Sequence, residues 1–166
     1  MARFEISKGF EDFEFALSKL ENKAVQNRIA KKAIYDGAAP LISEMRAQTR
    51  AIPTDKFRFL RDGDQMRSIS EQEKEQLAES FGVSPIKERD DGWSLKMGFQ
   101  GYNSFATKKY PKGVPNPLIV ASIESGSSVR TKYPIVRNTI NQRRQETIAA
   151  MRETAMAEFR EIFSKR

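Results

Sequence analysis

The stretch V-S-P-I-K-E-R-D-D-G-W-S-L-K-M-G-F, residues 83–99, decides the fold class. In its second half an apolar residue returns at every other position: Trp93, Leu95, Met97 and Phe99. This alternation is typical of a half-buried β-strand. Asp91-Gly92, just before it, favours a tight type I′ turn. The sequence therefore predicts a β-hairpin over 84–99.

Helical periodicity dominates the chain before this hairpin. A short strand is expected at 4–6, followed by an amphipathic helix over about 10–21. Asn22 can cap a second, long helix that ends near Arg50. The apolar stripe of this helix recurs at every fourth residue: Val25, Ile29, Ala33, Gly37, Leu41 and Met45. Pro40 lies inside it, where the missing backbone donor should produce a kink.

Capping residues and prolines mark the ends of two further helices. Ser70 and Glu73 have the spacing of a capping box, which predicts a short helix over 71–81. Pro134 has the fixed backbone geometry that opens a helix. We expect this last helix to be long and to continue to about Phe163.

Residues 116–125 allow two interpretations. Asn116-Pro117 is typical of a helix start, and Gly126 of a helix end. A strand is the alternative, because the L-I-V run inside the segment is β-prone. We expect a helix, because both ends carry helix signals.

Together these elements predict an α+β fold in a single domain, residues 1–166. The N-terminal strand and the central hairpin form a small antiparallel sheet that helices cover. The second helix is long and kinked, and the C-terminal helix is long. The residues expected to be mostly buried lie on the apolar faces of these elements: Phe13, Leu17, Ile29, Trp93, Leu95, Phe99, Met151 and Phe159.

The residue types that the chain lacks exclude several kinds of active site. It has neither cysteine nor histidine, so thiolate metal sites and Ser–His–Asp or Cys–His catalysis are excluded. Asp62 and Asp64 do not continue into the ligand spacing of a calcium loop. We therefore expect no catalytic centre, no metal site and no cofactor. No apolar run approaches the ~20 residues of a membrane span and no secretory signal is visible, so we expect a protein made in the cytoplasm, without a membrane partner.

The net charge of +7 is confined to one segment. Residues 101–145 contain a single acidic residue, Glu124, while the rest of the chain balances to zero. The basic residues of the segment are Lys108, Lys109, Lys112, Arg130, Lys132, Arg137, Arg143 and Arg144. A local field of this kind attracts polyanions; the simpler interpretation is a solvated surface. Glycines and prolines predict that 100–115 is a mobile basic loop.

The segment L-I-V-A-S-I-E-S-G-S-S-V-R-T-K-Y-P-I-V-R, residues 118–137, resembles a motif of the tail-component family of tailed phages. That motif has an apolar segment, Glu, an aromatic residue or Ser, Gly, and Thr or Ser. A short basic loop follows, and Pro-Phe-aliphatic-Arg then opens the last helix. The matching residues are Glu124, Gly126, Ser127, Pro134, Val136 and Arg137. Ile135 stands where Phe is usual, and R-A-I-P-T at 50–54 resembles the family's Ala-Pro after the second helix.

The resemblance implies a non-enzymatic structural subunit of a phage or a phage-tail-like particle. Such neck or tail-completion proteins form a ring, commonly a hexamer, at the head–tail junction of the virion. The ring lies between head-connector and tail-tube proteins, and DNA passes through it. The resemblance also implies that the subunits assemble through the motif: Glu124, Ser125, Gly126, Ser127, Ser128, Pro134 and Arg137.

The chemistry of these residues adds two expectations. Gly126 can take the left-handed conformation that ends a helix, and Glu124 can pair with Arg137 to pin the turn between the last two helices. The residues expected to face DNA or an acidic rim of a partner protein are Lys108, Lys109, Lys112, Arg130 and Lys132. We expect a protein contact for 127–133 and a DNA-facing or mobile role for 101–115. The alternative function is a small basic nucleic-acid-binding accessory or regulatory protein.

Overall fold

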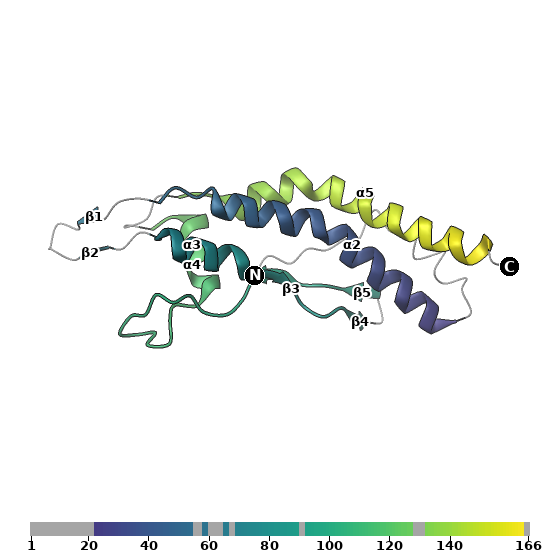
Figure 1. Ribbon diagram of the computed structural model, residues 1–166, viewed down its shortest axis with the longest axis horizontal. Coiled ribbons are helices and arrows are strands. Elements are labelled where there is room, and N and C mark those ends of the chain that lie inside the picture. The colour runs from purple at the N-terminus through teal and green to yellow at the C-terminus, as the bar shows by residue number, and fades with distance from the viewer. Residues whose placement is uncertain are drawn as a thin grey trace. The chain divides into compact units, whose positions relative to one another are not determined.

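The computed structural model describes residues 22–54, 58–59, 65–66, 69–89, 92–127 and 132–164 (Figure 1). The described elements follow in chain order: α2 (Lys23–Arg50), β1 (Arg58–Phe59), β2 (Gln65–Met66), α3 (Glu71–Glu79), β3 (Phe81–Val83), β4 (Lys87–Arg89), β5 (Gly92–Ser94), β6 (Met97–Phe99), α4 (Asn116–Ser125) and α5 (Ile135–Ser164). The α+β class, with small sheets and long helices, is confirmed. The strand predicted at 4–6 and the helix predicted at 10–21 lie outside the described residues.

These elements form two compact units, which the two long helices share. The first unit contains Ile42–Gly82 and Gly98–Asn141. The second contains Val83–Met97, Gln142–Arg166 and the part of α2 up to Leu41. The prediction of a single domain stays a prediction. Within the described ranges, no helix is long and apolar enough to cross a membrane.

In the second unit, α2 and α5 pack with very little space between their backbones (Figure 1). A Cβ added to Gly37 would lie 2.0 Å from Cγ of Met151 and 2.9 Å from its backbone N and Cα. Met151 is fully buried there. Between the same two helices, the Lys32 ammonium of α2 donates a hydrogen bond to the Glu158 carboxylate of α5. Gly37 therefore permits a helix contact that any side chain would obstruct.

The start of α2 is as predicted, and the helix continues past Pro40. Oδ1 of Asn22 accepts hydrogen bonds from the backbone N–H of Ala24 and Val25, at 3.0 and 3.3 Å. The helix runs without interruption through Pro40 to Arg50. The kink at this proline stays a prediction.

The central hairpin forms, but its register differs from the prediction by one residue. β4 pairs antiparallel with β5, with Arg89 opposite Gly92. Gly92 therefore belongs to the returning strand, and Asp91-Gly92 as the turn pair was wrong. Gly92 still needs a φ of +123°, but as the first residue of the returning strand.

The alternating row after the turn is two short strands rather than one. β5 ends at Ser94, and β6, which pairs with β3, starts at Met97. Between them, Ser84 and Lys96 exchange hydrogen bonds: the Ser84 N–H donates to the Lys96 carbonyl at 2.8 Å, and the Lys96 N–H donates to Ser84 Oγ at 3.1 Å. The single strand over 93–99 was wrong because the chain changes pairing partner halfway.

This change of partner divides the predicted core. Ile29, Phe99, Met151 and Phe159 are buried, as predicted. Trp93 and Leu95 are only half-buried: Trp93 lies in the two-stranded hairpin, and Leu95 lies in the connection between β5 and β6. The Trp93 indole donates to Oδ1 of Asn27 on α2 at 2.6 Å. Phe13 and Leu17 lie outside the described residues.

In the first unit, α3 begins with the predicted capping box. The Glu73 N–H donates to Ser70 Oγ, and the Ser70 N–H donates to the Glu73 carboxylate. The helix ends at Glu79 instead of 81, because Phe81 begins β3. The Phe81 and Phe99 rings then meet edge to face, with centroids 4.9 Å apart.

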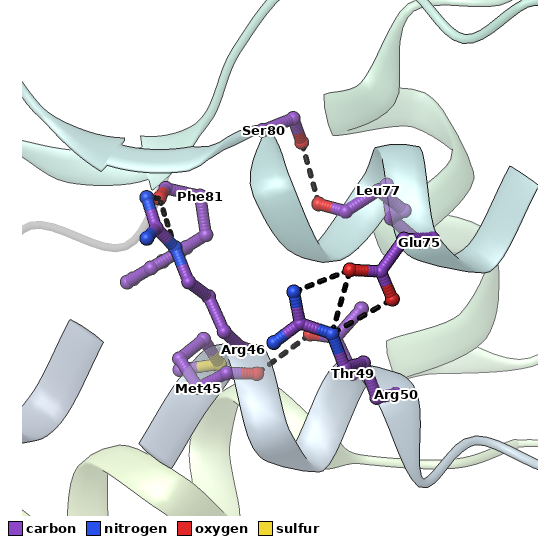
Figure 2. A network of polar contacts seen from close by, with 8 residues as sticks. All are labelled: Met45, Arg46, Thr49, Arg50, Glu75, Leu77, Ser80 and Phe81. Atoms are coloured by element: carbon purple, nitrogen blue, oxygen red, sulfur yellow. Dashed lines mark hydrogen bonds and ion pairs between the residues drawn. The ribbon is translucent and has the colours of Figure 1, made fainter. Parts of the chain in front are cut away.

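Two arginines of α2 connect this helix to α3 and β3 (Figure 2). Arg46 donates through Nε and Nη2 to the Phe81 carbonyl, at 3.2 and 3.0 Å. Arg50 makes a two-pronged contact with the Glu75 carboxylate, with Nε 2.9 and 2.7 Å from the two oxygens. The hydrogen bonds from Arg50 lower the pKa of Glu75, and its charge acts in the same direction.

The Arg50–Glu75 pair should give the protein a measurable pH dependence. A carboxyl whose pKa is lowered by folding stabilises the fold above its ordinary pKa, near 4.5, and loses that effect as the pH falls through the lower, folded value. We expect Glu75→Gln to lower Tm at pH 7, by a small amount because the pair is half-exposed. The difference from the unmodified chain should close below about pH 4.5. Thermal melts between pH 3 and 7 test this, with Glu153→Gln on the exposed face of α5 as control; a Tm difference that does not change with pH would contradict it.

Candidate assembly joint and lysine hairpin

The described residues of the predicted assembly motif form the joint between α4 and α5, which comprises residues 123–127 and 132–137. At its centre is the Glu124 carboxylate, near the end of α4. Its two oxygens accept the backbone N–H groups of Val136, at 2.9 Å, and Arg137, at 3.1 Å. These N–H groups belong to the first turn of α5 and have no partner inside the helix. Glu124 therefore caps the following helix, and its negative charge lies at the positive end of the helix dipole.

This contact corrects the atoms of the predicted Glu124–Arg137 pair. The carboxylate binds the backbone N–H of Arg137 instead of its guanidinium. The predicted effect, pinning of the turn between the two helices, is nevertheless what the hydrogen bonds produce. A second backbone bond closes the joint, from the Tyr133 N–H to the Ile123 carbonyl at 2.7 Å.

Gly126 ends α4 in a conformation that other residues avoid. Its φ of +74° and ψ of 168° lie in a region that is essentially limited to glycine. This is a more extended conformation than the predicted left-handed cap. A Cβ at this position would also lie 3.0 Å from Cβ of Lys132 and 3.2 Å from its backbone. The glycine therefore allows the chain to fold back tightly over residue 132.

The other motif residues lie around this joint. Pro134 immediately precedes α5, as predicted, and Arg137 is exposed in its first turn. Ser125 and Ser127 are exposed at the end of α4 and just after it. Ser128 and Arg130 lie outside the described residues. Two large apolar side chains are also exposed: Leu118, near the start of α4, at 47%, and Tyr133, just before α5, at 38%.

The three predicted lysines of the basic loop lie on a separate structure, the lysine hairpin, which comprises residues 101–116. The Thr107 and Tyr110 backbones exchange hydrogen bonds of 3.1 and 3.0 Å, so Lys108 and Lys109 occupy the two central positions of a tight turn. The Gly113 N–H donates to the Tyr110 carbonyl at 3.0 Å, and this second turn contains Lys112. All three lysines are exposed.

Backbone hydrogen bonds continue from these turns to the base of the lysine hairpin. They join Val114 to Phe105, Asn103 to Val114, and Asn116 to Gly101, with N···O distances of 2.7 to 3.0 Å. Gly113 has a φ of +106°, and a Cβ there would lie 2.0 Å from the Asn103 carbonyl oxygen. The predicted mobility of 100–115 stays a prediction, but its backbone groups are extensively paired.

Two buried asparagines fix the base of the lysine hairpin, and the sequence interpretation missed both roles. Asn103 donates through Nδ2 to the Glu73 carbonyl of α3 at 3.0 Å. Asn116 donates through Nδ2 to the Gln100 carbonyl at 2.7 Å. Asn116 is the first helical residue and Pro115 the N-cap, so the predicted cap at Asn116 was wrong by one position. The helix predicted over 116–125 is confirmed. The asparagines, glycines and prolines of this segment indicate turns, but they do not indicate which carbonyl groups the asparagine side chains bind.

The described surface of the joint and the lysine hairpin carries ammonium groups and a few exposed apolar side chains. In the described ranges, no three acidic side chains gather closely enough to hold a metal ion. No protein-family model, curated protein or solved structure matches the chain.

The Glu124 cap can be tested by its contribution to stability. We expect Glu124→Ala to lower the free energy of unfolding by about 1–2 kcal/mol, because two N–H groups lose a charged acceptor. Glu124→Gln keeps one acceptor oxygen without the charge and should lose less. Urea unfolding measures this difference, with the exposed neighbour substitution Ser125→Ala as control. Equal stability of Glu124→Ala and Ser125→Ala would contradict the assigned cap.

Proposed function

We propose that the chain is a non-enzymatic structural subunit of a phage or phage-tail-like particle, and that its copies form a ring at the head–tail junction. The observation that carries this proposal is the α4–α5 joint. The described residues that resemble the phage motif, 124–127 and 134–137, lie at the end of α4 and around the start of α5, and the Glu124 carboxylate holds these two helix ends together. Helix ends that are fixed against each other present the same surface on every copy, which a symmetric assembly requires.

The surface around the joint supports a contact between subunits. Leu118, near the start of α4, and Tyr133, just before α5, are exposed apolar side chains, and Ser125 and Ser127 are exposed polar residues at the end of α4 and just after it. Apolar residues surrounded by polar ones are typical of sites of protein association. A contact of this surface with a different face of the next copy is head-to-tail, and such contacts close into rings.

The lysine hairpin favours the second candidate, a small nucleic-acid-binding accessory protein. Both functions use a basic surface, so charge does not discriminate between them. Oligomeric state does, because a ring is a large, discrete assembly and an accessory protein is a monomer or dimer that binds DNA alone.

Size-exclusion chromatography with light scattering of the full chain, over a range of concentrations, tests the proposal. We expect one large oligomer of defined mass. Leu118→Ser with Tyr133→Ser should shift it toward the monomer. The matched control changes two exposed residues of the second unit, Tyr35→Ser with Met156→Ser, and should leave the mass unchanged. A monomer or dimer at every concentration, with DNA affinity of its own, would favour the accessory function.

A further inference from the structure

We propose that the lysine hairpin is a preformed site for the phosphate backbone of duplex DNA, which it binds without reading the base sequence. This inference rests on residues 101–116 and is independent of whether the chain forms a ring. Three features carry it: the unneutralised charge of three lysines, the fixed turns that hold them, and the chemistry of the exposed tip.

No described carboxylate neutralises the ammonium groups of the three lysines. No acidic residue occurs in the sequence between Asp91 and Glu124. Among the described residues, no carboxylate forms an ion pair with Lys108, Lys109 or Lys112. The ion pairs of the described residues involve other lysines and arginines. Charges placed this closely without counter-ions repel one another and attract a polyanion.

The turns hold these lysines close together before any ligand arrives. Lys108 and Lys109 are consecutive in one tight turn, and Lys112 follows in the next. Nζ of Lys109 lies 5.5 Å from the centre of the Tyr110 ring, which restricts that side chain. Asn103 connects the other end of the hairpin to α3. Because backbone hydrogen bonds already pair this segment, binding costs less conformational entropy than it would for an unpaired basic tail.

The composition of the tip favours phosphate groups over a protein partner. The exposed residues of the two turns are the three lysines and Pro111, with no large apolar side chain among them. Protein interfaces are depleted in lysine and need a buried apolar or aromatic centre. A DNA backbone needs only point charges, because each contact releases a condensed counter-ion.

Fluorescence anisotropy of the full chain with a labelled mixed-sequence DNA duplex tests the proposal over a series of salt concentrations. The test variant changes Lys108, Lys109 and Lys112 to Ser. We expect its affinity at low salt to fall at least about tenfold, and the slope of log K against log salt to become shallower by about 2 to 3. A second duplex of different sequence should bind equally well, because backbone contacts carry no base readout.

A matched control removes the same charge elsewhere. Lys31, Lys87 and Lys96 are exposed lysines of the second unit, and none forms an ion pair with a described residue. Their triple change to Ser should leave the DNA affinity within about threefold and the slope reduced by less than 1. An equal loss in both triple variants would assign binding to the net charge of the chain and overturn the proposal. Thermal melts of both variants check that the fold is kept.

Two further measurements test the geometry of the lysine hairpin and the class of polyanion that it binds. Gly113→Ala retains every charge but places a Cβ against the Asn103 carbonyl, so we expect weaker binding with an unchanged salt slope. Polyglutamate of the same charge as the duplex should compete at least about tenfold less well than unlabelled DNA. Equal competition by polyglutamate, or no DNA binding by the unmodified chain at low salt, would overturn a phosphate site in favour of an acidic protein partner.

Discussion

Gly37→Ala should destabilise the protein by about 2–3 kcal/mol, although the same substitution in an open helix would stabilise it by ~1 kcal/mol. The added Cβ would lie 2.0 Å from Met151 Cγ and 2.9 Å from two of its backbone atoms. The side chain of Met151 can rotate away, but the backbone of α5 can yield only if the two helices separate. Such a separation opens the buried contact around Ala33 and Ala155.

Urea unfolding of Gly37→Ala measures this effect directly, and Gly98→Ala is its control. A Cβ at Gly98 would meet no described atom within 4 Å, so we expect that change to alter stability by less than about 1 kcal/mol. The sign of the Gly37 effect is the informative quantity. An increase in stability would mean that α2 and α5 do not approach closely at this residue.

Phe99→Ala should cost about 3–5 kcal/mol of unfolding free energy. Phe99 is 8% exposed and contacts the Phe81 ring edge to face, so its removal leaves a cavity and ends an aromatic contact. The aromatic control is Tyr102→Ala, three residues later and 66% exposed, which should cost less than about 0.5 kcal/mol. Thermal or urea unfolding distinguishes the two. Similar losses for both substitutions would show that the side chain of Phe99 is not in the core.

Local signals in the sequence predicted helix ends well. The Asn22 cap, the Ser70–Glu73 capping box and the Gly126 stop each act within one turn of the helix that they limit. A side chain and a backbone group so close in sequence meet whatever the rest of the fold does. These three helix ends were therefore predictable, whereas the equally local signals at Asn116 and at Asp91-Gly92 were each misplaced by one residue.

Strand pairing depended on contacts that a single alternating row does not contain. Residues 93–99 have a uniform period of two, but β5 pairs with β4 and β6 pairs with β3. β5 takes a nearby partner, with Lys87 opposite Ser94. The chain after β5 instead pairs with residues more than ten positions away, as in the backbone hydrogen bond from Ser84 to Lys96. The alternation predicted extended structure correctly and could not predict the change of partner.

The candidate site shows the same division. The concentration of lysine at 101–115 and the need for glycine at 126 could be read from the sequence. The role of Glu124 could not, because a carboxylate has the same chemistry toward a guanidinium and toward a helix N-terminus. The anchoring of the lysine hairpin by Asn103 was also hidden, since its partner is a backbone carbonyl 30 residues earlier in the chain.

We proposed above that the chain is a structural subunit at a head–tail junction. Its position in a particle is the strongest test of that role. The measurement is electron microscopy of particles produced by the cell that encodes the chain, with a gold-labelled antibody raised against it. We expect the gold label at one position per particle, between head and tail. Deletion of the gene should leave heads and tails unjoined. Normal, fully joined particles after deletion, or particles without label at the junction, would contradict it.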